Sequence, residues 1–289
     1  MNLRKLILMF LGMINATVYA DGSDRYALAT GASAASRLTT QDKLLRTRSY
    51  HHLNQAGLSE GKTVWDIGCG NGMMTVYIAK AVGPKGHIYA MDASQEQLNI
   101  AKKNVEEAGL HNVTFIHGDI QSDKQHLIMH SADIVYARML LMHLPDPEKA
   151  IANIKLILKK NGILASQETI MSSGYCSYHT EEYKKQVEAM VSLGEHLGVD
   201  YDIGNKLKNL YKSSGFTKIT EDIEPVYIPS EMGKEMINGG LREWKDKAIL
   251  ANIITSEDIK RWENIYNNMP TDDPTFILAF NVAYIIATI

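Results

Sequence analysis

A glycine-rich turn is the feature of this sequence most able to do chemistry. Val64 and Trp65 lead into Asp66, and glycines follow at every second position before an apolar run that starts at Met73. Alternating glycines let a backbone turn tightly and come close to a ligand, and the strand–turn–helix context is the one that such a motif requires. We therefore expect a ligand across this turn. The residues predicted to bind it are Asp66, Gly68, Cys69, Gly70, Asn71 and Gly72.

The spacing of the turn favours one cofactor over another. A dinucleotide site needs Gly-x-Gly-x-x-Gly with the pyrophosphate at the helix N-terminus, whereas position 73 is Met in this sequence. Asp66 would also place negative charge near that phosphate. A carboxylate suits a ligand with a cationic end, such as S-adenosylmethionine, which carries an ammonium and a sulfonium but no phosphate. A nicotinamide-dependent oxidoreductase remains the alternative.

The elements that must position this turn follow from the hydrophobic pattern. From residue 63 onward, short β-branched runs alternate with helical periodicity, which is typical of βαβ units and a parallel sheet. Strands are predicted at residues 63–67, 87–91, 113–117, 132–136 and 162–167, and helices at 73–82, 94–108, 122–130 and 147–160. Asn161 and Gly162 form a left-handed stop after the last helix.

The alternation changes after Glu168. Helices are predicted at residues 24–54, 180–197 and 203–213, a mostly helical stretch at 231–269, and strands at 216–228 and 275–289. The last run is apolar, but it is too short to span a bilayer and Asn281 interrupts it, so a buried strand is expected. The sequence therefore predicts an α/β fold with a doubly wound, mainly parallel seven-stranded sheet.

Motifs at successive strand ends resemble those of class I S-adenosylmethionine-dependent methyltransferases. The first motif matches from Asp66 to Gly72, Asp92 ends the second strand, Asp119 follows the third, and Arg138 follows the fourth. The resemblance extends over most of residues 65–168. Within the family, the sequence is similar to a bacterial subgroup that acts on small molecules. It implies the Rossmann-like methyltransferase fold, with a helical N-terminal cap at 21–60, a methyltransferase domain at 61–289, a helical insertion at about 169–200 and a helical segment at about 230–269.

The resemblance also implies roles for individual residues. Asp92 would hold the ribose hydroxyls, since its two oxygens suit a vicinal diol. The Asp119 carboxylate and the Ile120 N–H would read the adenine edge. The further cofactor contacts implied are Tyr26, Ala93, Gln97 and Arg138.

Each of these residues also has an ordinary structural explanation. Asp66 could be a charge near a helix N-terminus, and Asp92 could be the N-cap of the next helix. The Cys69 thiol could be activated near a helix N-terminus, but a small loop residue is the favoured interpretation.

The implied activity is methyl transfer to a small-molecule acceptor by in-line displacement. The cofactor supplies the electrophile, so the protein mainly has to align and desolvate the reactants. No Asn/Asp-Pro-Pro-Tyr follows the fourth strand, which argues against amino-methylation of adenine or glutamine. No Pro-Cys nucleophile of the kind that cytosine C5 methylation requires occurs either. The alternatives are methylation of a protein and cofactor binding without turnover.

His143 is the best acid/base candidate, because it follows the fourth strand on the ligand side and histidine titrates near neutrality. A structural histidine in this loop is the alternative. His126 and His130 are four residues apart, but no third ligand is evident, so no metal site is predicted.

The amino-acid composition limits the classes of binding partner that are expected. Thirty basic and 33 acidic residues give a net charge of −3, which does not favour binding to a nucleic acid or an anionic membrane. Two cysteines cannot make a disulfide framework. We expect a small-molecule substrate, no nucleic-acid partner and no stable membrane insertion.

The first twenty residues resemble a secretory signal peptide. Arg4 and Lys5 precede an apolar run, and Val18 and Ala20 occupy positions −3 and −1 of a cleavage site. This predicts an exported protein, periplasmic or secreted. The alternative is an uncleaved N-terminal helix on a cytoplasmic protein.

Overall fold

The computed structural model describes residue 28 and residues 31–289 of the chain. The predicted signal peptide at residues 1–20 and the predicted cofactor contact Tyr26 lie outside the described residues.

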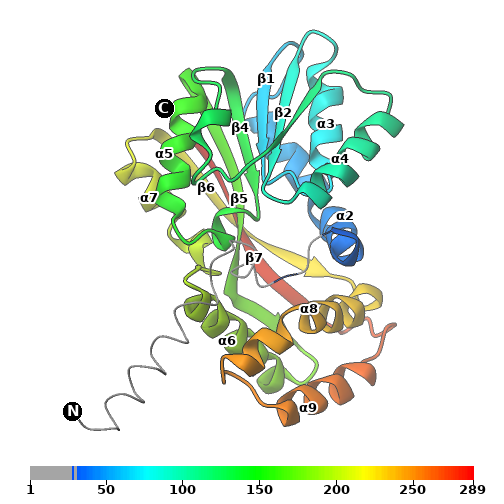
Figure 1. The fold of residues 1–289 in the computed structure, drawn as a ribbon. Helices are drawn as coiled ribbons and strands as arrows, with labels where there is room; N and C mark the ends of the chain where they lie inside the picture. Colours follow the sequence, from blue (N-terminus) through cyan, green and yellow to red (C-terminus); the bar gives the residue numbers. More distant parts are fainter. Residues whose placement is uncertain (1–27, 29–30) are drawn as a thin grey trace, which may run out of the picture.

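A seven-stranded sheet forms the centre of the protein, in the order β3-β2-β1-β4-β5-β7-β6 (Figure 1). The first five strands pair in parallel, and β7 runs antiparallel to both of its neighbours. The doubly wound, mainly parallel sheet predicted from the sequence is confirmed. The strands are β1 (Thr63–Ile67), β2 (His87–Asp92), β3 (Val113–His117), β4 (Ala132–Arg138), β5 (Leu158–Cys176), β6 (Thr217–Ile228) and β7 (Leu278–Thr288).

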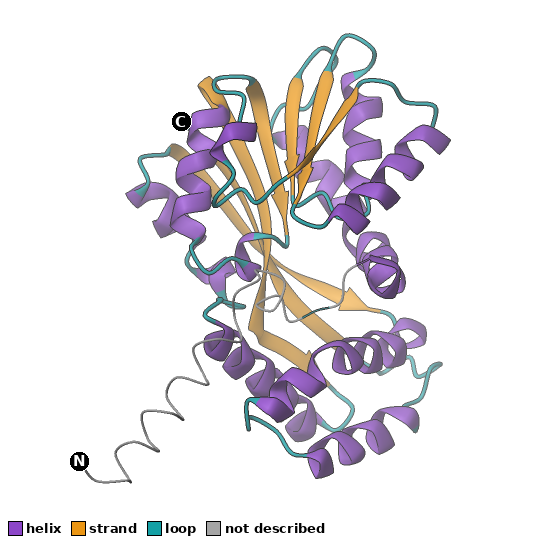
Figure 2. Ribbon diagram, in the orientation of Figure 1, coloured by secondary structure: helices purple, strands orange, loops and turns teal. Residues whose placement is uncertain are grey.

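Helices cover both faces of the parallel part of the sheet, as Figure 2 shows. One core cluster joins β1 and β4 to the helices of one face, through residues such as Leu53 of α2 and Ile78 of α3. The other joins the sheet to α5 and α7 through residues such as Ile154 and Tyr211. The helices of this upper part are α2 (Gly31–Gln55), α3 (Met73–Val82), α4 (Gln95–Glu107), α5 (Pro147–Ile157) and α7 (Leu207–Ser213).

Two helix predictions in the upper part were wrong in extent. The helix expected at residues 122–130 is only a short 3-10 turn, Lys124–His126, because its apolar residues Ile128 and Met129 remain exposed and give a helix nothing to bury. Helix α5 ends at Ile157 rather than at residue 160, since Leu158 already pairs with β4. Asn161 does adopt the predicted left-handed conformation, with φ 63°.

Strand β5 is much longer than the sequence pattern predicted. Residues 169–176, expected to begin a helical insertion, continue β5 instead, because β7 offers a partner strand there: Thr169 pairs with Val282 and Cys176 with Leu278. The helix of the insertion, α6 (Thr180–Leu197), starts only after this extension.

The late helical stretch is two helices, α8 (Ser230–Leu250) and α9 (Ser256–Asn267). Thr255 starts α9 with a capping box, in which its side chain and that of Asp258 each accept the other's backbone N–H. In Figure 1, α6, α8 and α9 surround the lower ends of β5, β6 and β7, below the parallel part of the sheet. No helix in the described part of the chain is both long and apolar enough to cross a membrane.

The packing of the glycine turn against α4 makes a prediction about stability. At Gly72, with φ 76°, an added Cβ would lie 2.7 Å from the Ala101 Cβ, whereas at Gly109, with φ 68°, it would meet nothing within 4 Å. We expect Gly109→Ala to cost about 1–2 kcal/mol for the left-handed backbone alone. Gly72→Ala should cost about 1–3 kcal/mol more, because of overpacking.

Urea unfolding of the two variants measures the difference. Equal losses in the free energy of unfolding would show that the contact between Gly72 and Ala101 does not constrain the turn.

Candidate functional site

The carboxyl ends of the parallel strands bring the predicted residues to one edge of the sheet. The register pairs Ile67 of β1 with Met91 of β2 on one side and with Ala137 of β4 on the other. Asp92 pairs in turn with His117 at the end of β3. The motifs that follow these strands are therefore neighbours in space, although the sequence separates them by tens of residues.

The glycine turn has the backbone conformation that its glycines predict. Gly68, Gly70 and Gly72 all have positive φ, at 70°, 53° and 76°. The Gly68 and Cys69 N–H groups both donate to the Met91 carbonyl, at 2.8 and 3.1 Å, which anchors the turn to β2. A side chain at any of the three glycine positions would be strained by its backbone.

Asp92 links this turn to the start of α4. Its carboxylate accepts the Gly70 N–H at 2.8 Å and the Ser94 N–H at 2.8 Å. The N-cap of α4 is Ser94, whose hydroxyl accepts the Gln97 N–H, so the N-cap role considered for Asp92 was wrong. Burial raises the pKa of Asp92, and the two N–H donors partly offset that rise.

The side chains of Asp66, just before the turn, and of Cys69, within it, are buried. Asp66 accepts a hydrogen bond from the Thr75 hydroxyl at 2.6 Å, and burial raises its pKa to about 6, which leaves the carboxyl mostly ionised at pH 7. Burial also raises the pKa of the Cys69 thiol. Because the thiolate is the reactive form, this shift favours the interpretation of Cys69 as a small loop residue.

A cavity of about 1580 Å³ opens at this edge of the sheet. This exceeds the roughly 300–1,000 Å³ of a pocket for one drug-sized ligand, so two molecules fit side by side. Its upper half contains all the predicted cofactor contacts on described residues except Gly72, which lies behind the turn against α4. Those lining residues are Asp66, Gly68, Cys69, Gly70, Asn71, Asp92, Ala93, Gln97, Asp119, Ile120 and Arg138.

The lower half of the cavity is a mainly apolar chamber that the sequence did not reveal. It lies between the extended ends of β5 and β7 and the helices α6 and α8. We call this part the apolar chamber; its principal lining side chains are Met171, Val187, Met190, Met236, Trp244 and Phe280.

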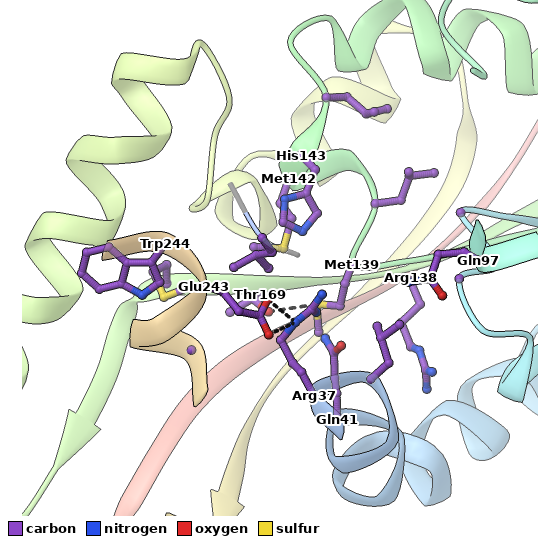
Figure 3. Close-up of a pocket in the computed structure, with 18 of the residues that line it drawn as sticks. Arg37, Gln41, Gln97, Arg138, Met139, Met142, His143, Thr169, Glu243 and Trp244 are labelled. Atoms are coloured by element: carbon purple, nitrogen blue, oxygen red, sulfur yellow. Dashed lines mark hydrogen bonds and ion pairs between the residues drawn. The ribbon is translucent and has the colours of Figure 1, made fainter. Parts of the chain in front are cut away.

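An ion pair lies where the two halves meet. The Arg37 Nε of α2 donates to the Glu243 carboxylate of α8 at 2.9 Å, and both side chains are largely buried. Figure 3 shows this pair between Gln97, on the side of the glycine turn, and Trp244, on the side of the chamber. The pair joins the N-terminal helix to the lower part of the protein across the cavity.

Two further polar contacts fix α2 over the sheet edge. Arg138 pairs with Asp42 of α2 at 3.2 Å, and the Ser49 hydroxyl donates to the Gln167 side-chain oxygen at 2.8 Å. Arg138 therefore lines the cavity, and its guanidinium also docks the helix.

Asp119 likewise makes local contacts. Its carboxylate accepts the Gln121 backbone N–H at 2.8 Å, which shapes the turn after β3.

The loop after β4 places His143 on the cavity wall, next to Tyr201. Burial, with a smaller contribution from the nearby Arg37 charge, lowers the pKa of His143 to about 3. The imidazole is therefore neutral across the physiological range and is a weak proton acceptor.

Glu168 holds this loop in place and was not among the predicted site residues. Its fully buried carboxyl accepts backbone N–H groups from Leu140 at 3.0 Å, Leu141 at 2.7 Å and Met142 at 3.4 Å. Burial raises the pKa of Glu168 to about 8. A carboxylate at the end of an apolar strand was the signal that could have marked it.

Met139, between β4 and this loop, has a strained backbone. Its φ of 51° is uncommon for a residue with a side chain, and such outliers cluster at functional sites. Its N–H donates to the Gln167 carbonyl at 2.8 Å and its sulfur accepts from the Thr169 hydroxyl at 2.9 Å. These two contacts to β5 hold the strained residue on the cavity wall.

Arg37, Glu243 and the chamber residues could not be identified as a group from the sequence. Arg37 and Glu243 are 206 positions apart, and each sits in an ordinary amphipathic helix. Within residue 28 and residues 31–289, no three His, Cys, Asp or Glu side chains come together to hold a metal ion.

Comparison with known proteins identifies related sequences. Residues 58–215 match the family described as "Methyltransferase domain". Demethylmenaquinone methyltransferase of Geobacillus stearothermophilus is 31% identical over 117 residues, which are 40% of this chain and 49% of that protein. The chain thus spans about half the length of this curated relative.

Solved structures show the same fold at low sequence identity. The YcgJ protein of Bacillus subtilis is 17% identical, with a TM-score of 0.53 over 83% of this chain and 98% of that one. The phosphoethanolamine N-methyltransferase 2 of Haemonchus contortus is 18% identical, with a TM-score of 0.52 over 84% of this chain and 52% of that one.

The buried Glu168 carboxyl predicts how stability depends on pH. Its pKa is about 8 in the folded protein against an ordinary value of 4.5, so the folded state holds a proton that the unfolded chain releases. The contribution of Glu168 to the free energy of unfolding is fully present below pH 4.5 and is lost as the pH rises to about 8. Glu168→Gln keeps an oxygen for the Leu140 and Leu141 N–H groups but does not titrate.

Thermal melting between pH 5 and pH 9 measures this effect. Over this range the melting temperature of the wild type should fall by roughly 10 °C more than that of Glu168→Gln. The exposed-site control Glu106→Gln should follow the wild type. Parallel curves for Glu168→Gln and the wild type would contradict the assignment.

Proposed function

The chain belongs to the class I S-adenosylmethionine-dependent methyltransferases, and from this membership we propose that it transfers a methyl group from S-adenosylmethionine to a small-molecule acceptor. The observation that carries the proposal is the Asp92 carboxylate. It closes the glycine turn and faces a cavity large enough for a cofactor and a second molecule.

The residues of the upper cavity fit this cofactor in three respects. The side-chain oxygen of Gln97 is buried on the cavity wall and has no hydrogen-bond partner among the described residues, so a ligand donor would satisfy it. An added Cβ on Gly70 would meet only the Leu38 side chain, at 3.9 Å, so the turn leaves room for close approach. Ionised Asp66 suits a cationic ligand and opposes a pyrophosphate.

Each residue would then have a defined task. Asp92 would bind the ribose hydroxyls, Gln97 would accept a hydrogen bond, and Asp119 with Ile120 would bind the adenine edge. When bound, S-adenosylmethionine supplies a methyl group activated by its sulfonium, ready for in-line displacement. The chain's contribution is to orient the acceptor and exclude water, and α2 serves this by covering the sheet edge through Asp42 and Arg138.

His143 would contribute as a neutral group. With a pKa of about 3 it carries no charge at pH 7, and it can hydrogen-bond to an acceptor without placing a cation beside the sulfonium. Its weak basicity favours acceptors that do not need strong deprotonation.

A small-molecule acceptor is supported by the depth of the site. The apolar chamber lies between strands β5 and β7 and helices α6 and α8, so an acceptor inside it would contact all four elements. The Geobacillus relative is also named for demethylmenaquinone, a small molecule.

Binding of S-adenosylhomocysteine tests the cofactor site. We expect Asp92→Asn to weaken its binding by about 1–3 kcal/mol, because a charge-assisted hydrogen bond to the ligand is lost. Asp133→Asn is the matched control, since Asp133 also accepts a backbone N–H, from Thr63 at 2.9 Å, but at the opposite edge of the sheet.

Calorimetry measures both affinities. Equal affinity in the wild type and Asp92→Asn would overturn the ribose assignment.

Transfer of a labelled methyl group tests turnover. Incubation of the protein with metabolite extract and methyl-labelled S-adenosylmethionine should label a low-molecular-weight product. At limiting cofactor, Asp92→Asn should reduce that labelling by about 5- to 150-fold, in line with the weaker cofactor binding. Label found only in protein, or cofactor binding with no transfer to any extract, would contradict the small-molecule proposal.

A further inference from the structure

We propose that the methyl acceptor is a predominantly apolar molecule that bears a hydroxyl group, held in the apolar chamber with its hydroxyl donating to the side-chain oxygen of Gln186. This inference rests on the proposed function and specifies the substrate class of the same site.

The side chains that line the chamber favour an apolar ligand. Met190 and Trp244 are each more than nine-tenths buried and line the cavity, together with Met171 from β5 and Phe280 from β7. Methionine and aromatic side chains bury large apolar areas, and methionine adapts its shape to an irregular ligand. A polar acceptor would lose its hydration here without compensation.

Two ion pairs line the cavity near the chamber. Arg37 binds Glu243 at 2.9 Å, and Arg242 binds Glu235 at 2.8 Å. The Arg242–Glu235 pair is exposed, whereas Arg37 and Glu243 are largely buried. A charged acceptor that displaced Arg37 or Glu243 would leave the other charge unpaired in a largely buried site, which is strongly unfavourable. The electrostatics therefore favour a neutral molecule.

Gln186 supplies the polar specificity. Its side chain on α6 is 6% exposed and lines the cavity, and its side-chain oxygen is buried without a hydrogen-bond partner among the described residues. A buried acceptor of this kind costs free energy unless a donor reaches it. A neutral apolar molecule can supply that donor through a hydroxyl group.

The position of Gln186 also fits an acceptor rather than the cofactor. Gln186 follows Tyr183 and precedes Val187 on α6, and all three line the cavity below the strand ends. The polar residues assigned to the cofactor lie instead on β1, β2, β4 and α4, in the glycine turn and in the turn after β3. The cofactor on one side of the Arg37–Glu243 pair and the methyl acceptor on the other would each contact one of these two sets of residues.

A series of 4-n-alkylphenols tests the apolar part of the proposal. Calorimetric titration of the full chain, saturated with S-adenosylhomocysteine, should show affinity rising about fourfold per added methylene from 4-ethylphenol to 4-n-hexylphenol. Met190→Gln should flatten that rise, whereas Met129→Gln, at a methionine exposed outside the chamber, should not. Affinity independent of chain length in the wild type would overturn the proposal.

A comparison of 4-n-hexylphenol with its methyl ether tests the hydroxyl. The wild type should bind the phenol about tenfold more tightly, because the ether cannot donate to Gln186. Gln186→Met, which keeps the side-chain length, should abolish this preference, and the exposed control Gln125→Met should keep it. Equal binding of phenol and ether by the wild type would overturn the role of Gln186.

The measurements separate this inference from the proposed function. If S-adenosylhomocysteine binds in an Asp92-dependent manner but no alkylphenol does, the acceptor class is wrong and the methyltransferase proposal stands. If S-adenosylhomocysteine itself does not bind, the proposed function fails first.

Discussion

The antiparallel pairing of β5 with β7 is the interaction on which the rest of the structure depends. Within the sheet it joins the five parallel strands to β6. Beyond the parallel strand ends it includes Thr169 and Ile170 and, after a register shift, resumes at Tyr175 and Cys176. This continuation gives α6 a surface to pack on, α8 packs on α6 and α9 packs on α8, in a core that is continuous with the upper one. The same two strands therefore support the cofactor edge and form one wall of the chamber beneath it.

This arrangement of strands explains why the upper half of the cavity is polar and the lower half is mainly apolar. Its upper half is made by parallel strand ends, where backbone N–H groups and carboxylates converge and Asp92 fastens the glycine turn at 2.8 Å. Its lower half is made by strand faces and amphipathic helices, which present methionine and aromatic side chains. The buried carboxyl of Glu168 stands between them and fixes the loop that carries His143. Glu168 can therefore position the residues between the two halves of the cavity without contacting a substrate itself.

Local patterns made the upper half predictable from the sequence. The glycine turn, Asp92 and the five parallel strands follow from spacing and strand ends, and the structure contains them where they were expected. The β5 extension was missed because residues 169–176 become a strand only through pairing with β7, more than 100 positions later. Gln186 and the Arg37–Glu243 pair were missed for the same reason, since tertiary contacts give each of them its place.

The site should bind S-adenosylmethionine rather than a dinucleotide, because the buried Asp66 carboxyl lies beside a turn that lacks the dinucleotide spacing. Calorimetric titration of the full-length protein with S-adenosylhomocysteine and, separately, with NADH tests it most directly. We predict one molecule of S-adenosylhomocysteine bound per chain and no heat of binding with NADH. Saturable binding of NADH, with none of S-adenosylhomocysteine, would contradict the account.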